Sequence, residues 1–128
     1  MRADCHMHTY FSGDSEAKPE DMVLAAIDKG LEAICFTDHE DIDYFCDDIE
    51  FVFDPETYFK ELGALKEKYK EKLDIRIGVE FGLQPHLAKK AKAFTVANPY
   101  DFVIGSMHVV GGKDPYYPEF FEGISDEE

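Results

Sequence analysis

Short apolar runs alternate with longer amphipathic segments along the whole chain. Residues 2–7 alternate between polar and apolar side chains and then run into Ser, Gly and Asp, which predicts a strand followed by a loop. Residues 32–39, 74–82 and 101–110 are short runs rich in β-branched, aromatic and other apolar residues, a pattern typical of buried strands. We therefore predict four strands.

Three amphipathic segments separate these strands. Residues 18–30 contain Pro19 at the predicted first helical position and end at Gly30, which is typical of a helix start and stop. Residues 55–72 and 85–94 predict two further helices. The apolar side of the second helix is predicted to consist of Phe59, Leu62 and Leu65.

Alternating strands and helices predict an α/β fold with a parallel sheet and right-handed crossovers. The acidic segment 40–54 and the Gly/Pro-rich segment 111–123 have no clear period, so we expect irregular structure there. At 128 residues, the chain is predicted to be one domain with a sizeable core.

Polar residues fall at the carboxyl ends of all four predicted strands. His6 and His8 close the first strand, Asp38 and His39 the second, Glu80 the third and His108 the fourth. In β/α barrels this rim is where active sites are built. The repeated position is stronger support for a site than any single motif.

Each residue at this rim also has a structural interpretation. His6 and His8 lie on the same side of a strand and can reach one metal ion, but alone they are as consistent with packing. Asp4 is predicted to hold one of their ring nitrogens, or to be a surface acid at a strand start. Asp38 is predicted to support His39 in the same way, or to cap a turn.

Glu80 is the most informative acid, because a charge inside an apolar strand is costly unless it is paired or binds a metal. We favour a metal ligand over a salt-bridge partner. Asp14 lies in a predicted loop and is a turn residue or, beside a metal cluster, a ligand. His86 follows Pro85 at a predicted helix start and is interpreted as a surface histidine.

The candidate ligands are nitrogen and oxygen donors without a thiolate, which suits Zn²⁺, Mn²⁺ or Fe²⁺. They exceed what one tetrahedral ion needs, so more than one metal ion is expected. Cys5 and Cys35 lie in apolar strand runs and are predicted to be buried free thiols. The candidate ligands are His6, His8, Asp14, His39, Glu80 and His108.

The formal net charge is −15, from 13 basic and 28 acidic residues. This charge repels phosphates, so nucleic-acid binding is not expected, and an anionic substrate would need bound metal ions to attract it. The sequence has no long apolar run and no signal-peptide pattern, so we expect a cytoplasmic protein without membrane association.

The motifs "DCHMH", "FTDH", "GVEF" and "GSMH" resemble, in order and spacing, those of the PHP (polymerase and histidinol phosphatase) superfamily. Residues 101–123 are similar to the stretch that marks its histidinol-phosphate phosphatases. The resemblance implies a distorted (β/α)7 barrel and up to three metal ions. It implies that a metal-bridging hydroxide attacks the phosphorus of L-histidinol phosphate, a step of histidine biosynthesis.

The resemblance also implies how the ligands divide. His6 and His8 would bind one ion, Glu80 would bridge two with His108 on the second, and Asp14 and His39 would serve the third. Glu80 and His108 would be catalytic.

Members of this superfamily are whole barrels of roughly twice this length, with further ligands and phosphate-binding basic residues downstream. We therefore expect residues 1–128 to be the N-terminal part of one PHP domain, with little activity alone. Exposed edges of its first and fourth strands would permit self-association.

Three other functions remain open at this stage. They are hydrolysis of another small phosphate ester or nucleotide, a structural or proofreading module of DNA polymerase machinery, and a non-catalytic metal-binding half-domain. A substrate panel, a test of single-strand binding and a test of turnover, respectively, would discriminate them from histidinol-phosphate hydrolysis.

Overall fold

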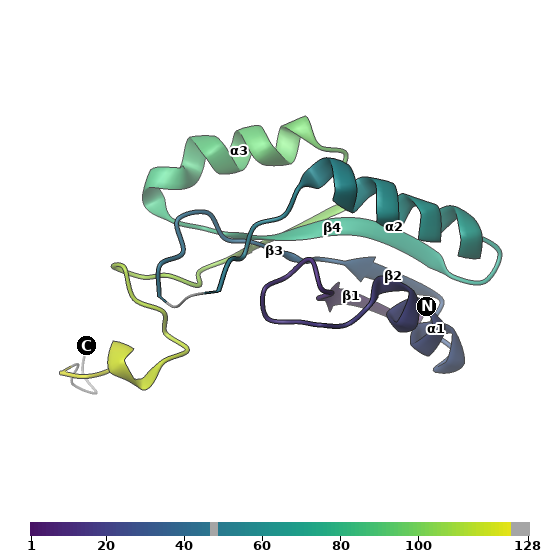
Figure 1. Ribbon diagram of the computed structural model, residues 1–128, viewed down its shortest axis with the longest axis horizontal. Helices are drawn as coiled ribbons and strands as arrows, with labels where there is room; N and C mark the ends of the chain where they lie inside the picture. Colours follow the sequence, from purple (N-terminus) through teal and green to yellow (C-terminus); the bar gives the residue numbers. More distant parts are fainter. Residues whose placement is uncertain (47–48, 124–128) are drawn as a thin grey trace.

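A curved parallel sheet forms the frame of the protein, and helices cover it (Figure 1). The computed structural model describes residues 1–46 and 49–123. The strands are β1 (Ala3–Met7), β2 (Ala33–Phe36), β3 (His39–Glu40), β4 (Asp74–Gly82) and β5 (Phe102–Ser106). The helices are α1 (Pro19–Asp28), α2 (Pro55–Tyr69) and α3 (Ala88–Ala97), with short 3₁₀ helices η1 (Pro85–Leu87) and η2 (Pro118–Phe120).

Strand β4 lies at the centre of the sheet, and every strand pairing is parallel. β2 and then β3 run along one side of β4, β5 pairs with its other side, and β1 pairs with β2. The carboxyl ends of the strands therefore meet at one rim, as the alternating pattern predicts. β1 and β5 are the two edges of the sheet.

The second predicted strand, residues 32–39, is divided into β2 and β3. At the break, the Thr37 hydroxyl accepts the backbone N–H of Met7 at 3.1 Å, whereas the Thr37 N–H bonds to the Met7 carbonyl at 2.9 Å. A side-chain oxygen thus replaces a backbone oxygen in the ladder. The prediction of four strands is wrong in this detail, because the apolar pattern does not register such a substitution.

The core lies between the sheet and helices α1 and α2. It contains Val23 and Ala26 of α1, Ile34 and Phe36 of β2, Tyr58, Leu62 and Leu65 of α2, and Leu73, Ile75 and Ile77 at or near β4. Tyr58 is fully buried while Phe59 is only half-buried, which corrects the predicted inner side of α2. The hydroxyl of Tyr58 donates to the Gly78 carbonyl at 3.1 Å, so burial of the tyrosine leaves its polar atom satisfied.

Helix ends follow the local chemistry of the sequence. α1 begins at the predicted Pro19, and Gly30 beyond its end has a φ of 69°, which glycine adopts without steric cost. α2 begins after Asp54, whose carboxylate accepts the Thr57 N–H at 2.9 Å. α2 ends earlier than predicted, because the backbone N–H groups of residues 72 and 73 turn back to the Tyr69 carbonyl. Among the described helices, none has the length and hydropathy of a membrane span.

The two edge strands are far more exposed than the central ones. Cys5 is exposed, whereas Cys35 on the neighbouring strand is buried. The prediction of a buried thiol is therefore confirmed for Cys35 and wrong for Cys5. The reason is topological: β1 has a strand neighbour on one side only, which its sequence pattern does not reveal.

Candidate metal centre

The rim of the sheet brings all six candidate ligands together. His6 is in β1, His39 in β3 and Glu80 in β4, while His108 follows the end of β5. His8 comes directly after β1, and Asp14 comes from the loop between β1 and α1. Because parallel strands end at the same edge, residues far apart in the sequence become neighbours here.

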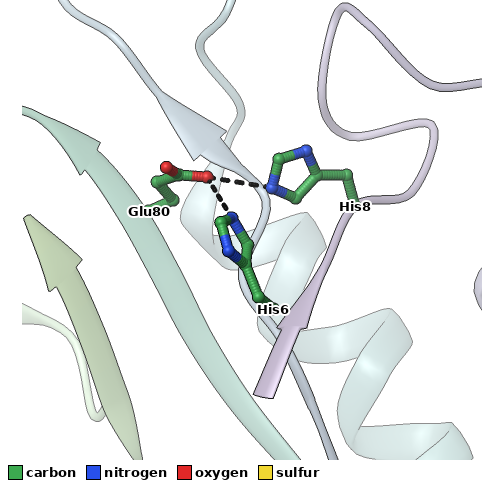
Figure 2. Close-up of side chains that lie close together, drawn as sticks. All are labelled: His6, His8 and Glu80. Carbon is green, nitrogen blue, oxygen red and sulfur yellow. Dashed lines mark hydrogen bonds and ion pairs between the residues drawn. The ribbon is translucent and has the colours of Figure 1, made fainter. Parts of the chain in front are cut away.

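The carboxylate of Glu80 is the centre of this cluster. Its Oε2 lies 2.7 Å from His6 Nε2 and 2.9 Å from His8 Nε2, and Figure 2 shows both imidazoles directed at that one oxygen. Its other oxygen, Oε1, lies 3.2 Å from His108 Nε2 and accepts the Ser106 hydroxyl at 2.6 Å. Glu80 thus presents one oxygen to His6 and His8 and the other to His108, as a bridging carboxylate requires.

Asp14 extends the cluster on its exposed side. Its Oδ2 lies 3.4 Å from His8 Nδ1 and 3.5 Å from His39 Nε2. Among the residues that the structure describes, three groups each have donor atoms within 4.8 Å of one another: His6 with His8 and Glu80, His8 with Asp14 and His39, and His39 with Glu80 and His108. Glu80 belongs to two of these groups, and its two oxygens could serve two neighbouring ions.

Asp41 is a functional candidate that sequence reasoning missed. Its buried carboxylate lies 3.0 Å from His39 Nδ1 through one oxygen and 2.7 Å from His108 Nδ1 through the other. A carboxylate at Nδ1 orients the ring and directs Nε2 toward the cluster. The sequence feature that could have indicated Asp41 is its spacing, because it follows the candidate ligand His39 by two positions in "HED".

The two acids predicted to support the ligands have other contacts. Asp4 accepts the backbone N–H of His6 at 3.1 Å. The β1–β2 register shifts between Asp4 and Met7, so strict alternation does not place Asp4 beside the His6 ring. Asp38 Oδ1 accepts the N–H and hydroxyl of Thr9 and the hydroxyl of Ser12, which matches the alternative of a turn cap.

The histidine contacts shift the ionisation of the centre. Burial by itself raises the pKa of Glu80, but hydrogen bonds from its four partners outweigh it and hold that pKa well below the usual glutamate range. Hydrogen bonds to Asp41 and Glu80 raise the pKa of His108 to about 10. The hydrogen bond to Glu80 also raises the pKa of His8. The centre therefore holds protons that bound cations would replace.

A cleft of about 640 Å³ opens beside the cluster. His39, His108, Asp14 and Asp41 line one part of it. The remaining wall comes from the loop after β3 and from the C-terminal segment, and consists of Tyr44, Ile49, Phe51, Asp114, Tyr116 and Tyr117. The cleft joins an acidic, imidazole-rich floor to an aromatic wall.

His86 is exposed, as predicted, and lies outside the cluster. Its Nε2 nevertheless lies 3.0 Å from Asp43 Oδ2, a contact that the sequence did not indicate.

The chain is similar to proteins of a known family. The PHP domain family matches residues 4–128. The histidinol-phosphatase of Lactococcus lactis subsp. lactis is 37% identical over 115 residues, which are 90% of this chain and 42% of that protein. The chain thus spans less than half the length of this relative.

Solved structures share the fold. Histidinol phosphate phosphatase from Lactococcus lactis, crystallised with zinc, L-histidinol and phosphate, has a TM-score of 0.81 and 38% identity, covering 87% of this chain and 41% of that one. A structure from Listeria monocytogenes has a TM-score of 0.81 at 22% identity, covering 94% of this chain and 52% of that one. The second match supports the fold alone.

Proposed function

The chain belongs to the PHP domain family, and from this premise we propose that the protein is a metal-dependent phosphatase that hydrolyses L-histidinol phosphate to L-histidinol and phosphate. The main support is the carboxylate of Glu80, one oxygen of which faces His6 and His8 while the other faces His108. A second support for the proposal is that the Lactococcus structure, which is similar in sequence, contains zinc, L-histidinol and phosphate.

The donor set fits divalent metal ions. Imidazole and carboxylate donors without thiolate suit Zn²⁺, Mn²⁺ and Fe²⁺, and we propose zinc, with up to three ions, one at each of the three overlapping groups. His6, His8 and Glu80 would hold the first, Glu80 and His108 the second, and Asp14 and His39 the third, since a neutral imidazole offers one lone pair to one ion. When bound, such ions offset negative charge on phosphoryl oxygens and lower the pKa of water.

The chain's own residues hold and orient this centre. Glu80 belongs to two of the three groups and His108 to one of those two, and we propose them as the catalytic pair. Ser106 fixes the Glu80 carboxylate by donating to Oε1 at 2.6 Å. Asp41 fixes the planes of His39 and His108 through their Nδ1 atoms. Fixed ligand orientation is what places reacting groups in line.

The cleft supports a substrate with a cationic or aromatic organic part. Its floor contains the proposed ligands His39 and His108, where a phosphoryl group would bind. Its wall contains Asp114 and the rings of Tyr44 and Tyr116, which suit an imidazole and an ammonium group by charge and by stacking. The net charge of −15 makes the bound cations necessary for attracting the phosphate.

Hydrolysis of L-histidinol phosphate by the full-length gene product, loaded with Zn²⁺ or Mn²⁺, tests the proposal. Phosphate release is measured together with metal content by elemental analysis, with a nucleotide and an unrelated phosphate ester as competing substrates. We expect a preference for L-histidinol phosphate. His8→Ala and Glu80→Gln should lose metal and reduce the rate by on the order of 100-fold or more, since they remove proposed ligands.

Glu71→Gln is the matched control, because it makes the same change at an exposed position outside the cluster. It should keep wild-type metal content and rate. Full hydrolysis by His8→Ala would refute the ligand assignment. Metal binding without hydrolysis of any of these esters would refute the phosphatase and favour a non-catalytic metal-binding domain.

A further inference from the structure

Two residues that follow β4 contact the loop after β3. Gln84 is half-buried, and its amide donates to the backbone carbonyls of Ile42 at 3.0 Å and Asp43 at 3.3 Å. His86 Nε2 lies 3.0 Å from Asp43 Oδ2. These contacts connect segments 41 to 43 positions apart in sequence. They join the loop to the segment that follows β4, outside the metal cluster.

The contacted loop has an unusual backbone. Asp43 has a φ of 59°, and among the described residues it is the one non-glycine position with positive φ. Aspartate adopts that conformation more readily than most residues with a Cβ, and here surrounding contacts hold it. The side chain and the carbonyl of Asp43 are both held, by His86 and Gln84 respectively.

The loop carries two residues of the site. Asp41 faces the Nδ1 atoms of His39 and His108. Tyr44 lines the cleft, and its ring packs edge-on against Phe51 at 5.0 Å, while Phe51 packs against His39 at 5.2 Å. A displacement of residues 42 and 43 would therefore move Asp41, which contacts two histidine rings, and Tyr44, which lines the cleft.

We propose that Gln84 and His86, which we call the β4 clamp, are positioning residues for the metal centre. They hold Ile42 and Asp43, and so fix Asp41 against His39 and His108. The pair of His86 and Asp43 is exposed and contributes little to stability, so we expect its removal to change the geometry of the loop more than the stability of the fold. This inference rests on the metal centre of the proposed function.

The test removes the clamp and measures two properties of the centre. Gln84→Met removes the amide donors at nearly constant size, and His86→Ala removes the contact with Asp43. In the metal-free chain, NMR detects the Nδ1 protons of His39 and His108 that face Asp41. We expect these resonances to shift or broaden in the double variant. We also expect Zn²⁺ affinity in a chelator competition to fall about 10-fold, the lower end of the range for lost outer contacts of metal ligands.

Two control variants separate the clamp from general effects. His86→Gln keeps a donor near the position of Nε2 and should restore most of the affinity, and Lys89→Ala changes an exposed residue of α3 and should behave as wild type. Circular dichroism verifies that each variant is folded. If the double variant unfolds, the same two measurements are made on the single variant His86→Ala, which changes only an exposed side chain.

Unchanged Nδ1 resonances and unchanged Zn²⁺ affinity in the variants would overturn the clamp while leaving the proposed function intact. Absence of Zn²⁺ binding by the wild type would instead count against the proposed function, and the NMR comparison would still decide the role of the clamp.

Discussion

His108 is the residue whose environment says most about the chemistry of the centre. Both of its ring nitrogens face carboxylates, Nδ1 that of Asp41 and Nε2 that of Glu80. The doubly protonated ring satisfies both contacts, which is why hydrogen bonds to Asp41 and Glu80 raise its pKa to about 10. A metal ion at Nε2 requires loss of that proton.

Zinc binding should therefore release protons at neutral pH. Because the pKa of His108 is about 10 in the metal-free chain, its ring is protonated at pH 7.5, and Zn²⁺ has to displace about one proton or more per chain. Calorimetric titration in buffers of different ionisation enthalpy measures this number. The apparent affinity should rise with pH between 6 and 9, and binding without proton release would contradict the assignment of His108 as a ligand.

The raised pKa of His108 has the opposite effect on the stability of the metal-free fold, which falls as the pH rises. A histidine whose folded pKa is raised above its ordinary value of 6.5 stabilises the fold below that value, and this contribution is lost as pH rises through about 10.

Strand β4 is the element on which the site is built. Glu80 projects from it toward the histidines, and Gly82 at its end lies against Asp41. A Cβ at Gly82 would lie 2.7 Å from Asp41 Cγ and closer still to Oδ1. Gly82 does not have a left-handed φ, so glycine is needed there for space and not for backbone freedom.

Gly82→Ala should leave the fold intact and weaken Zn²⁺ binding. The added methyl group pushes the Asp41 carboxylate away from His39 and His108, so we expect a loss of affinity of about 10-fold, in the range for disturbed outer contacts of a metal ligand. Chelator competition measures the loss.

Gly63→Ala is the matched control, because a Cβ there meets nothing within 4 Å in the middle of α2. It should bind Zn²⁺ as wild type does and stabilise the fold by about 0.5–1 kcal/mol, measured by urea unfolding. Wild-type affinity in Gly82→Ala would show that the position of Asp41 does not govern the centre.

At the scale of the whole molecule, two properties oppose each other. The sheet is open, with β1 and β5 as edges, and Phe102 of β5 is 45% exposed. Free strand edges favour pairing with another chain. The net charge of −15 opposes contact between copies, and salt screens that repulsion.

We therefore expect the 128-residue chain to self-associate at high ionic strength and to be monomeric at low ionic strength. Sedimentation velocity at several concentrations and salt levels measures the transition. Phe102→Lys should suppress association by placing a charge on the edge strand, whereas Val96→Lys, on the 77% exposed Val96 of α3, should not. Association that is insensitive to Phe102→Lys would exclude β5 as the contact.

The sequence by itself determined the order of strands and helices, the parallel sheet and the six candidate ligands. Strand ends can be read from a local pattern, and parallel topology places those ends at one rim. His6, Glu80 and His108 meet for this reason, although 74 positions separate His6 from Glu80 and 28 separate Glu80 from His108 in sequence.

Only the tertiary structure decided which acids support these ligands. Asp41 takes the role predicted for Asp4 and Asp38, because a register shift in β1 and the turn at Thr9 and Ser12 redirect those two carboxylates. The contact between His86 and Asp43, and the exposure of Cys5, also depend on which segments lie side by side. Local periodicity does not encode such contacts, since they arise when loops from distant parts of the chain close over the same rim.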